Sequence, residues 1–428
     1  MEKTSIYNFN QRMSALRISP FEGGLRGMFL GLICSLVTLL APAQTLQDYL
    51  KEAVTNNPEL KALGYEYEIA KTKPDEVSEL GDTRFGVGYF VSEAETRTGA
   101  QKARFSMQQE LPVMGVTKSK KGEAIATIDL EKNKIEIAKR KLYLEVKKAY
   151  YELYGCKRKI GVLATKKALL KKYHETALTA LENNQTTAVT VLKITIAENE
   201  LGQEEELLKG ELLNREKKLN RLLNRDGFEE LAVPEKLAIP EEEPTMALDE
   251  VTYHPEALQF DYAETIVAQQ QKTNAREGLP SLSVGLDYVI VEERLNLDFS
   301  DNGKDIVMPM ISFSAPIFSK KHRTKAKQYG LKQEALLEQR AHTENVLSER
   351  LERAINNRIT ARIVYDTQRK NIEQTQQAEE MLLASYQSGI LDFSALLELQ
   401  EMQLDYELTK IESVKDYFIQ TAIINYML

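Results

Sequence analysis

The residues of this chain that could carry chemistry are few and scattered. A lysine-rich run, Lys118–Gly122, lacks the glycine framework of a phosphate-binding loop. The four histidines lie far apart and form no H-x-x-x-H or Cys/His arrangement with the spacing of metal ligands: His174, His254, His322 and His342. The sequence therefore predicts no catalytic residue, no metal site, no cofactor and no enzyme activity.

Three carboxylates near the C-terminus recur at helical spacing: Glu398, Glu401 and Asp405. Side chains three and four residues apart share one face of a helix, so these would form an acidic stripe. From spacing alone, such a stripe is an ordinary solvated helix face.

Short sequence markers occur twice along the chain, once in each half. Asn57-Pro58-Glu59 opens one half, and His254-Pro255-Glu256 opens the other half 197 residues later. Leu111-Pro112 and Ala315-Pro316 lie 204 residues apart. Matching markers at nearly constant offset indicate an internal repeat, in which each copy is an incomplete structural unit.

Each half contains a long stretch without proline that predicts a helix, over 117–182 and over 321–387. A shorter helix is expected after each, over 188–225 and 391–426. Apolar residues recur every seven positions, most regularly at Ile390, Leu397, Leu404, Ile411 and Phe418. This spacing is typical of a coiled coil. At 1.5 Å per residue each long helix would measure about 100 Å, too long for an ordinary globular domain.

Shorter segments before each long helix have a period of two, which predicts β-strands with one apolar face. The expected strands cover 84–92, 101–111, 281–293 and 305–317. In the first of them, apolar Phe85, Val87, Tyr89 and Val91 alternate with Arg84, Gly86 and Gly88. Each half should therefore contain one hairpin.

Strands of this kind are typical of a membrane β-barrel, but four of them are too few to close one. An open sheet edge in lipid would leave N–H and C=O groups unpaired, each at a cost of several kcal/mol. If the strands lie in a membrane, several chains must share one barrel. The alternative is a small soluble sheet packed on the helices.

The first 43 residues are expected to be a signal peptide. An apolar core, Met28–Leu40, precedes the small-residue site Ala41-Pro42-Ala43, and this core is too short to cross a bilayer as a helix. Residues 226–245 contain three prolines and many acidic residues, which predicts a linker. The linker divides a first repeat, 44–225, from a second repeat, 246–428.

Composition narrows the class of protein further. The net charge is −8 at pH 7 and no basic run suggests a nucleic-acid partner. No segment after the leader approaches the length of about 20 apolar residues that a membrane-spanning helix needs. Cys156 is the only cysteine beyond the leader, so no intrachain disulfide is expected, and the thiol is interpreted as a packing residue.

This pattern resembles the TolC family of outer-membrane efflux ducts. The resemblance covers 44–428 and rests on the two N/H-P-E openings, Gly278–Val284, the L-P and A-P pairs before the long helices, and Tyr386–Gly389. It implies a mainly α fold with a transmembrane β part. Three protomers would each give four strands to one 12-stranded β-barrel in the cell outer membrane, continued by a periplasmic α-barrel of coiled-coil hairpins.

The resemblance also implies a function. The chain would be a homotrimeric exit duct of a tripartite efflux or type I secretion system, embedded in outer-membrane lipid. It would meet a periplasmic adaptor protein and an inner-membrane pump, and pass small toxic compounds, metals or other cargo to the exterior. The alternative is a periplasmic coiled-coil scaffold or adaptor without a pore.

Site residues carried over from the family lie at the ends of the helical hairpins. The implied pore constriction comprises Tyr386, Glu398, Glu401 and Asp405. Leu391 and Ala395 stand where family members often place an arginine and a first acidic residue, so the acidic ring rests mainly on Glu398. The implied adaptor-docking tips comprise Asn184, Gln185 and Thr186 in the first repeat, and Ser388, Gly389 and Ile390 in the second.

Two basic clusters occupy equivalent points, where a strand passes into a long helix. They are Lys118–Lys121 in the first repeat and Lys320–Arg323 in the second. We interpret them as a solvated basic collar near lipid headgroups.

Overall fold

A computed structural model of the chain describes residues 45–428 apart from 113–114, 184–185, 244–251, 296–297 and 388–392. The expected signal peptide lies outside the described residues. The helices are α2 (Leu46–Asn56), α3 (Pro58–Glu76), α4 (Val116–Glu182), α5 (Ala188–Leu222), α6 (Pro255–Glu277), α7 (Lys321–Gln387) and α8 (Ser394–Met427). The strands are β1 (Arg84–Thr96), β2 (Gly99–Leu111), β3 (Ser281–Glu292) and β4 (Ile306–Ser314).

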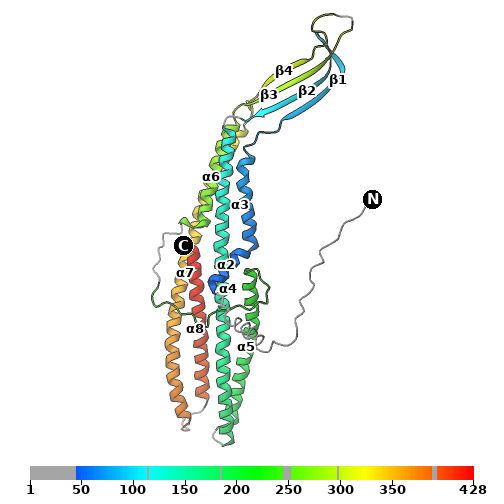
Figure 1. Ribbon diagram of the computed structural model, residues 1–428. Helices are drawn as coiled ribbons and strands as arrows, with labels where there is room; N and C mark the ends of the chain where they lie inside the picture. Colours follow the sequence, from blue (N-terminus) through cyan, green and yellow to red (C-terminus); the bar gives the residue numbers. More distant parts are fainter. Residues whose placement is uncertain (1–44, 113–114, 184–185, 244–251, 296–297, 388–392) are drawn as a thin grey trace, which may run out of the picture. The chain divides into compact units, whose positions relative to one another are not determined.

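The element order repeats, as the sequence markers indicate. Helix, hairpin, long helix and shorter helix follow one another as α3-β1-β2-α4-α5 and again as α6-β3-β4-α7-α8. The two hairpins join into one antiparallel sheet with the strand order β1-β2-β3-β4. Figure 1 shows this sheet beyond the ends of α3, α4 and α6, with the shorter helices α5 and α8 running back along α4 and α7. The fold is mainly helical with a small sheet, as predicted.

The long helices α4 and α7 each have 67 residues, or about 100 Å of helix. α4 begins at Val116, and α7 spans the predicted 321–387. Both remain unbroken because neither contains proline, the residue that removes a helical donor and clashes with the preceding turn.

The strands differ from expectation at their ends. β1 continues to Thr96, past the predicted end at residue 92, because a register irregularity between Tyr89 and Ala94 lets pairing with β2 resume. β4 ends at Ser314, before the predicted end at residue 317. Pro316 has no N–H to continue the ladder, which accounts for this early end.

Two helices were missed by the sequence analysis, α3 and α6. Both bury few side chains, only Ala70 and Pro74 in the case of α3, so the apolar periodicity is weak. The usable signal was at the N-termini. Asn57 caps α3 by accepting a hydrogen bond from the Leu60 N–H at 2.9 Å, and proline follows the cap in both helices.

The segment between the repeats packs on the helices. Its Leu231 is buried with Tyr49 of α2 and Leu219 of α5, and its Ile239 is buried with Tyr154 of α4. The hydroxyl of Tyr154 accepts a hydrogen bond from the Leu237 N–H at 3.1 Å. The described part of this linker therefore belongs to the helical core, and its conformation is set by side-chain packing.

His254 caps α6 and also ties the C-terminal helix to it. Its Nδ1 accepts a hydrogen bond from the Glu256 N–H at 3.2 Å, and its Nε2–H donates to the Tyr426 carbonyl at 2.9 Å. The bond accepted at Nδ1 requires the neutral imidazole, because a protonated ring has no free acceptor, and His254 is only 1% exposed. Burial lowers the pKa of His254 below its ordinary 6.5.

We expect the His254→Asn variant to lose part of the acid sensitivity of the fold. Below pH 6.5 the unfolded chain binds a proton that the folded chain binds only at lower pH, so the wild type loses stability as pH falls. Asparagine still caps α6 but does not titrate, and loss of the Tyr426 bond costs about 1 kcal/mol at neutral pH. Thermal unfolding of both proteins near pH 7.5 and pH 5.5 measures how much stability each loses between the two pH values.

The control is His342→Asn, because His342 is exposed on α7. It should retain the wild-type pH dependence. An unchanged pH dependence in His254→Asn would contradict the role assigned to the buried imidazole.

Candidate functional site

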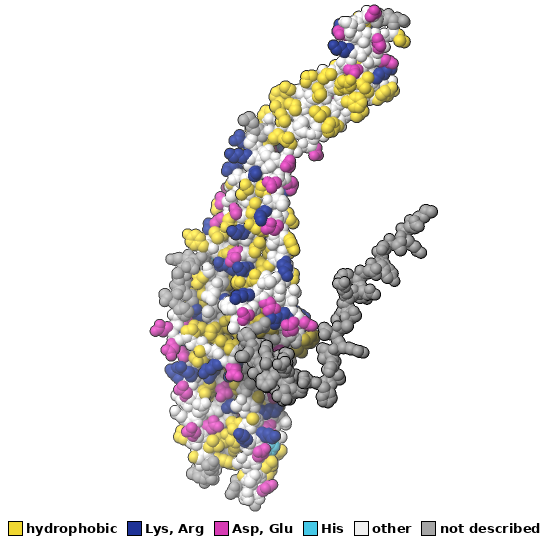
Figure 2. All heavy atoms as spheres, in the orientation of Figure 1, with side chains coloured by type: hydrophobic (Ala, Val, Ile, Leu, Met, Phe, Trp, Pro, Cys, Tyr) yellow, Lys and Arg dark blue, Asp and Glu magenta, His cyan; other side chains and the backbone are white. Residues whose placement is uncertain are grey.

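One face of the sheet is apolar and exposed. The register aligns Val87 of β1 with Phe105 of β2, Phe105 with Tyr288 of β3, and Tyr288 with Val307 of β4. Eleven large apolar side chains on this face are between 38% and 78% exposed: Phe85, Val87, Tyr89, Phe105, Met107, Val284, Leu286, Tyr288, Val307, Ile311 and Phe313. Figure 2 shows hydrophobic side chains gathered over the sheet. So large an exposed patch marks an interaction surface.

The opposite face carries many small and polar residues, together with Met308 and Met310 of β4. Gly86 pairs with Ser106, Ser106 with Asp287, and Gly285 with Gln108. A Cβ atom at Gly86 would lie 2.5 Å from the Ser106 hydroxyl oxygen, so a larger residue at this position would require the serine side chain to rotate away. Asp287 is fully buried and forms an ion pair with Arg104 of β2. One sheet thus separates an apolar environment from a polar one.

The two outer strands of this sheet each have a partner on one side only. β1 pairs with β2, and β4 pairs with β3. Their other edges present backbone N–H and C=O groups without a partner strand among the described residues. β1 and β4 are therefore the edge strands of an open sheet.

The predicted acidic stripe lies exposed on α8. Glu401 and Asp405 line a groove of 280 Å³ between α4, α5 and α8. Two further carboxylates, Glu200 and Glu204 of α5, line the same groove. The sequence analysis missed this pair, although its spacing of four residues places both side chains on one helix face. Glu398 is exposed one turn before Glu401 on α8.

Tyr386, the fourth residue of the implied constriction, lies in an apolar cluster. Its ring packs against Phe393 with centroids 5.4 Å apart, and Phe393 packs equally closely against Tyr173 of α4. Buried Leu396 and Leu397 of α8 belong to the same cluster. In this structure the Tyr386 ring joins α7 to α8 by packing.

A buried polar network lies beside the acidic groove. Lys166 of α4 is 8% exposed, and its Nζ donates to the side-chain oxygens of Gln400 at 3.1 Å and Gln403 at 2.8 Å. Gln403 in turn donates to Glu379 of α7 at 3.0 Å, and the Tyr173 hydroxyl donates to the same carboxylate at 3.1 Å. Burial, followed by the proximity of Glu379, raises the pKa of Tyr173, so the phenol stays protonated and keeps donating. The network joins α4 to both helices of the second hairpin.

The candidate docking tips are only partly described. Thr186 is half-buried and precedes Thr187, whose hydroxyl accepts a hydrogen bond from the Thr190 N–H at the start of α5. The other five candidate tip residues lie outside the described residues: Asn184, Gln185, Ser388, Gly389 and Ile390.

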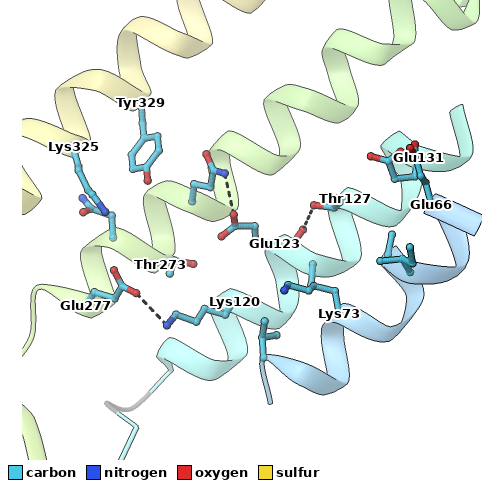
Figure 3. A pocket seen from close by; sticks show the side chains of 16 residues that line it. Glu66, Lys73, Lys120, Glu123, Thr127, Glu131, Thr273, Glu277, Lys325 and Tyr329 are labelled. Atoms are coloured by element: carbon cyan, nitrogen blue, oxygen red, sulfur yellow. Dashed lines mark hydrogen bonds and ion pairs between the residues drawn. The ribbon is translucent and has the colours of Figure 1, made fainter. Parts of the chain in front are cut away.

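A larger groove of 710 Å³ lies between α3, α4, α6 and α7 (Figure 3). Its charged side chains partly neutralise one another. Lys120 pairs with Glu277 at 3.3 Å, and Gln270 donates to Glu123 at 2.9 Å. The ionisable residues of both signs that line it are Glu66, Lys73, Lys120, Glu123, Glu131, Glu277 and Lys325. The lining of this groove therefore carries charges of both signs.

No group of three or more histidine, cysteine or acidic side chains among the described residues could hold a metal ion. Cys156 is buried, and its thiol donates to the Leu208 carbonyl at 3.4 Å. Burial raises the pKa of this thiol, so it stays protonated at neutral pH. None of the helices in the described part of the chain is both long and apolar enough to cross a membrane.

The search of protein-family models found no match, and the search of curated proteins found none either. Comparison with solved structures gave extensive matches. The channel-forming protein CusC is 11% identical, with a TM-score of 0.74 over 90% of this chain and 92% of that one. The outer-membrane channel CmeC of Campylobacter jejuni is 14% identical, with a TM-score of 0.71 over 98% and 93%.

The open state of the outer-membrane channel MtrE of Neisseria gonorrhoeae is 16% identical, with a TM-score of 0.72 over 89% of this chain and 88% of that one. This chain therefore has the fold of the outer-membrane channel proteins. The predicted resemblance to the TolC family is confirmed at the level of the fold, over almost the full length of these structures.

We expect the Lys166→Met variant to loosen the second hairpin from α4. The substitution leaves the oxygens of Gln400 and Gln403 without their buried donor, which should lower the free energy of unfolding by about 1–3 kcal/mol. Thermal unfolding followed by helical circular dichroism measures the change.

The matched control is Lys167→Met, one position further along α4. Lys167 forms an exposed ion pair with Glu205 at 2.9 Å, worth about 1 kcal/mol or less. Equal destabilisation by the two variants would contradict a special role for the buried network.

Proposed function

We propose that this protein is an outer-membrane channel that serves as the exit duct of an efflux or secretion assembly and is not an enzyme. The observation that carries the proposal is the four-stranded sheet with one apolar face, one polar face and two open edges. Three copies would pair β4 of one chain with β1 of the next and close a 12-stranded barrel. In a closed barrel every strand has a partner on both sides, so its backbone N–H and C=O groups are paired. A lone chain in lipid would leave the groups along two strand edges unpaired.

The two faces of the sheet determine its orientation in such a barrel. The apolar face with Phe85, Tyr288 and Phe313 would contact lipid. The face with Gly86, Ser106 and the Arg104–Asp287 pair would line the water-filled lumen. Strands of 9 to 13 residues are long enough to cross the apolar layer when tilted.

The helices would continue the duct on the periplasmic side, after export directed by the leader over 1–43. In a trimer, Glu398, Glu401 and Asp405 each become three like charges around one axis, and Glu200 and Glu204 can add to them. Such rings form a cation-selective constriction near the helical end of the pore. Tyr386 would support this end by packing rather than by lining it.

The remaining parts of the proposal concern partners. The tips at 184–186 and 388–390 would meet a periplasmic adaptor that links the duct to an inner-membrane pump. Support comes from the fold shared with the channels CmeC and MtrE. Cargo would be selected by the pump, because a wide duct contacts what it passes only loosely.

Closure of the barrel predicts disulfides between copies. Within one chain, β1 and β4 are separated by β2 and β3, about 14 Å at the usual strand spacing. This is too far for a disulfide. We expect the Val87→Cys change, combined in turn with Val307→Cys, Ile311→Cys or Phe313→Cys, to give covalent dimers and trimers in at least one register.

Non-reducing gels of membrane fractions separate the monomer from the covalent dimers and trimers. Val87→Cys alone is the control, because the only other cysteine beyond the leader, Cys156, is buried. A monomer in every combination, together with a monomeric species in detergent, would rule out the shared barrel.

Charge reversal in the groove tests the constriction. We expect the double variant Glu401→Lys/Asp405→Lys to lower the cation-to-anion permeability ratio of single channels, because three copies replace six negative charges with six positive ones. Reversal potentials in a salt gradient across planar bilayers measure the ratio. Glu407→Lys, on another face of α8, is the control, and an equal effect of that variant would contradict the assignment.

A further inference from the structure

We propose that the segment following β4 is a membrane-interface anchor that binds the headgroups of anionic phospholipids. The anchor comprises Ile317, Phe318, Lys320, Lys321 and Arg323. This inference rests on the proposed channel function, which places the sheet in a bilayer, and it adds a specific lipid class and the residues that would bind it.

The apolar part of the anchor is fully accessible. Phe318 is 97% exposed and Ile317 is 80% exposed, although neither belongs to a strand. They follow directly on the apolar face of β4, where Phe313 is 78% exposed. Aromatic side chains just beyond the apolar layer are typical of residues that sit at the level of lipid headgroups.

The basic part lies immediately beside it. Lys320, Lys321 and Arg323 are exposed, and none of them forms an ion pair with a carboxylate among the described residues. No acidic residue occurs from 306 to 333, in a chain whose net charge is −8. This concentration of unneutralised positive charge contrasts with the paired lysines along the helices, such as Lys120 with Glu277.

The anchor has a defined position relative to the sheet and α6. The Asn274 side chain donates to the His322 carbonyl at 2.8 Å, and its oxygen lies 3.1 Å from His322 Nδ1. A hydrogen bond from the Ile317 N–H to the Ala315 carbonyl at 2.9 Å closes the turn before Phe318. The basic residues are therefore held at the boundary between sheet and helices.

The first repeat supplies a second basic cluster at the equivalent boundary. Lys118 and Lys121 are exposed at the start of α4 and have no carboxylate partner among the described residues. Figure 2 shows lysine and arginine side chains gathered where the apolar sheet meets the helices. Each chain would thus present positive charge at this level in both repeats.

An anionic phospholipid satisfies both parts of the anchor at once. Its negatively charged headgroup would pair with the basic residues, and its acyl chains would contact Ile317 and Phe318. A free phosphate ion would leave the two apolar side chains in water. The combination of adjacent charge and apolar surface therefore favours a lipid over a small anion.

The experiment uses the absence of tryptophan from the chain. The Phe318→Trp variant carries the only indole, so its fluorescence reports on this position alone. The full-length protein is reconstituted in vesicles that contain a fixed fraction of brominated phosphatidylglycerol or brominated phosphatidylcholine. Bromine quenches an adjacent indole, so the ratio of the two quenching constants measures enrichment of the anionic lipid at residue 318.

We expect Phe318→Trp to be quenched by both lipids and more strongly by phosphatidylglycerol. Adding Lys320→Gln, Lys321→Gln and Arg323→Gln should remove most of the preference for phosphatidylglycerol and bring the ratio of quenching constants close to one. The control adds Lys171→Gln, Lys172→Gln and Lys370→Gln, which remove the same charge from exposed positions on α4 and α7. This control should keep the parent ratio.

A second reporter separates failure of the anchor from failure of the channel. Phe313→Trp lies on the apolar face of the sheet and should be quenched by bromolipid whether or not the anchor exists. Quenching of Phe313→Trp without quenching of Phe318→Trp would overturn the anchor and leave the channel intact. Quenching of neither would overturn the proposed function, and a parent ratio of one would overturn the preference for anionic lipid.

Discussion

The two open edges of the sheet are the constraint on which the rest of the structure depends. Water can satisfy an exposed strand edge, but hydrocarbon cannot. Because one face of the same sheet is covered with side chains such as Val87, Tyr288 and Phe313, the strands are suited to an apolar phase. In the proposed channel, copies of the chain meet both requirements by completing one another's sheets.

Much of the architecture could be predicted from the sequence because its signals are local. The absence of proline over 321–387 and the alternation in Arg84–Tyr89 mark a helix and a strand without reference to any partner. α3 and α6 were missed because their burial is sparse, so that only Asn57 and His254, as caps before proline, marked where they begin.

The site was less predictable because its members meet only in three dimensions. Glu401 and Asp405 form a recognisable stripe along α8, but their neighbours Glu200 and Glu204 are about 200 residues away in the sequence. Lys166 looks like any lysine of a charged helix until packing places it against Gln400 and Gln403. Tertiary proximity, which periodicity does not encode, decides these roles.

The pairing of β2 with β3 has a consequence for biogenesis. Leu111 lies beside Leu282, so the middle of the sheet joins parts of the chain that are synthesised far apart in time. Contacts of such wide sequence separation form slowly, since a long loop must close first. Until the second repeat has been made, β2 has no partner on its β3 side, so the first hairpin exposes two unpaired strand edges.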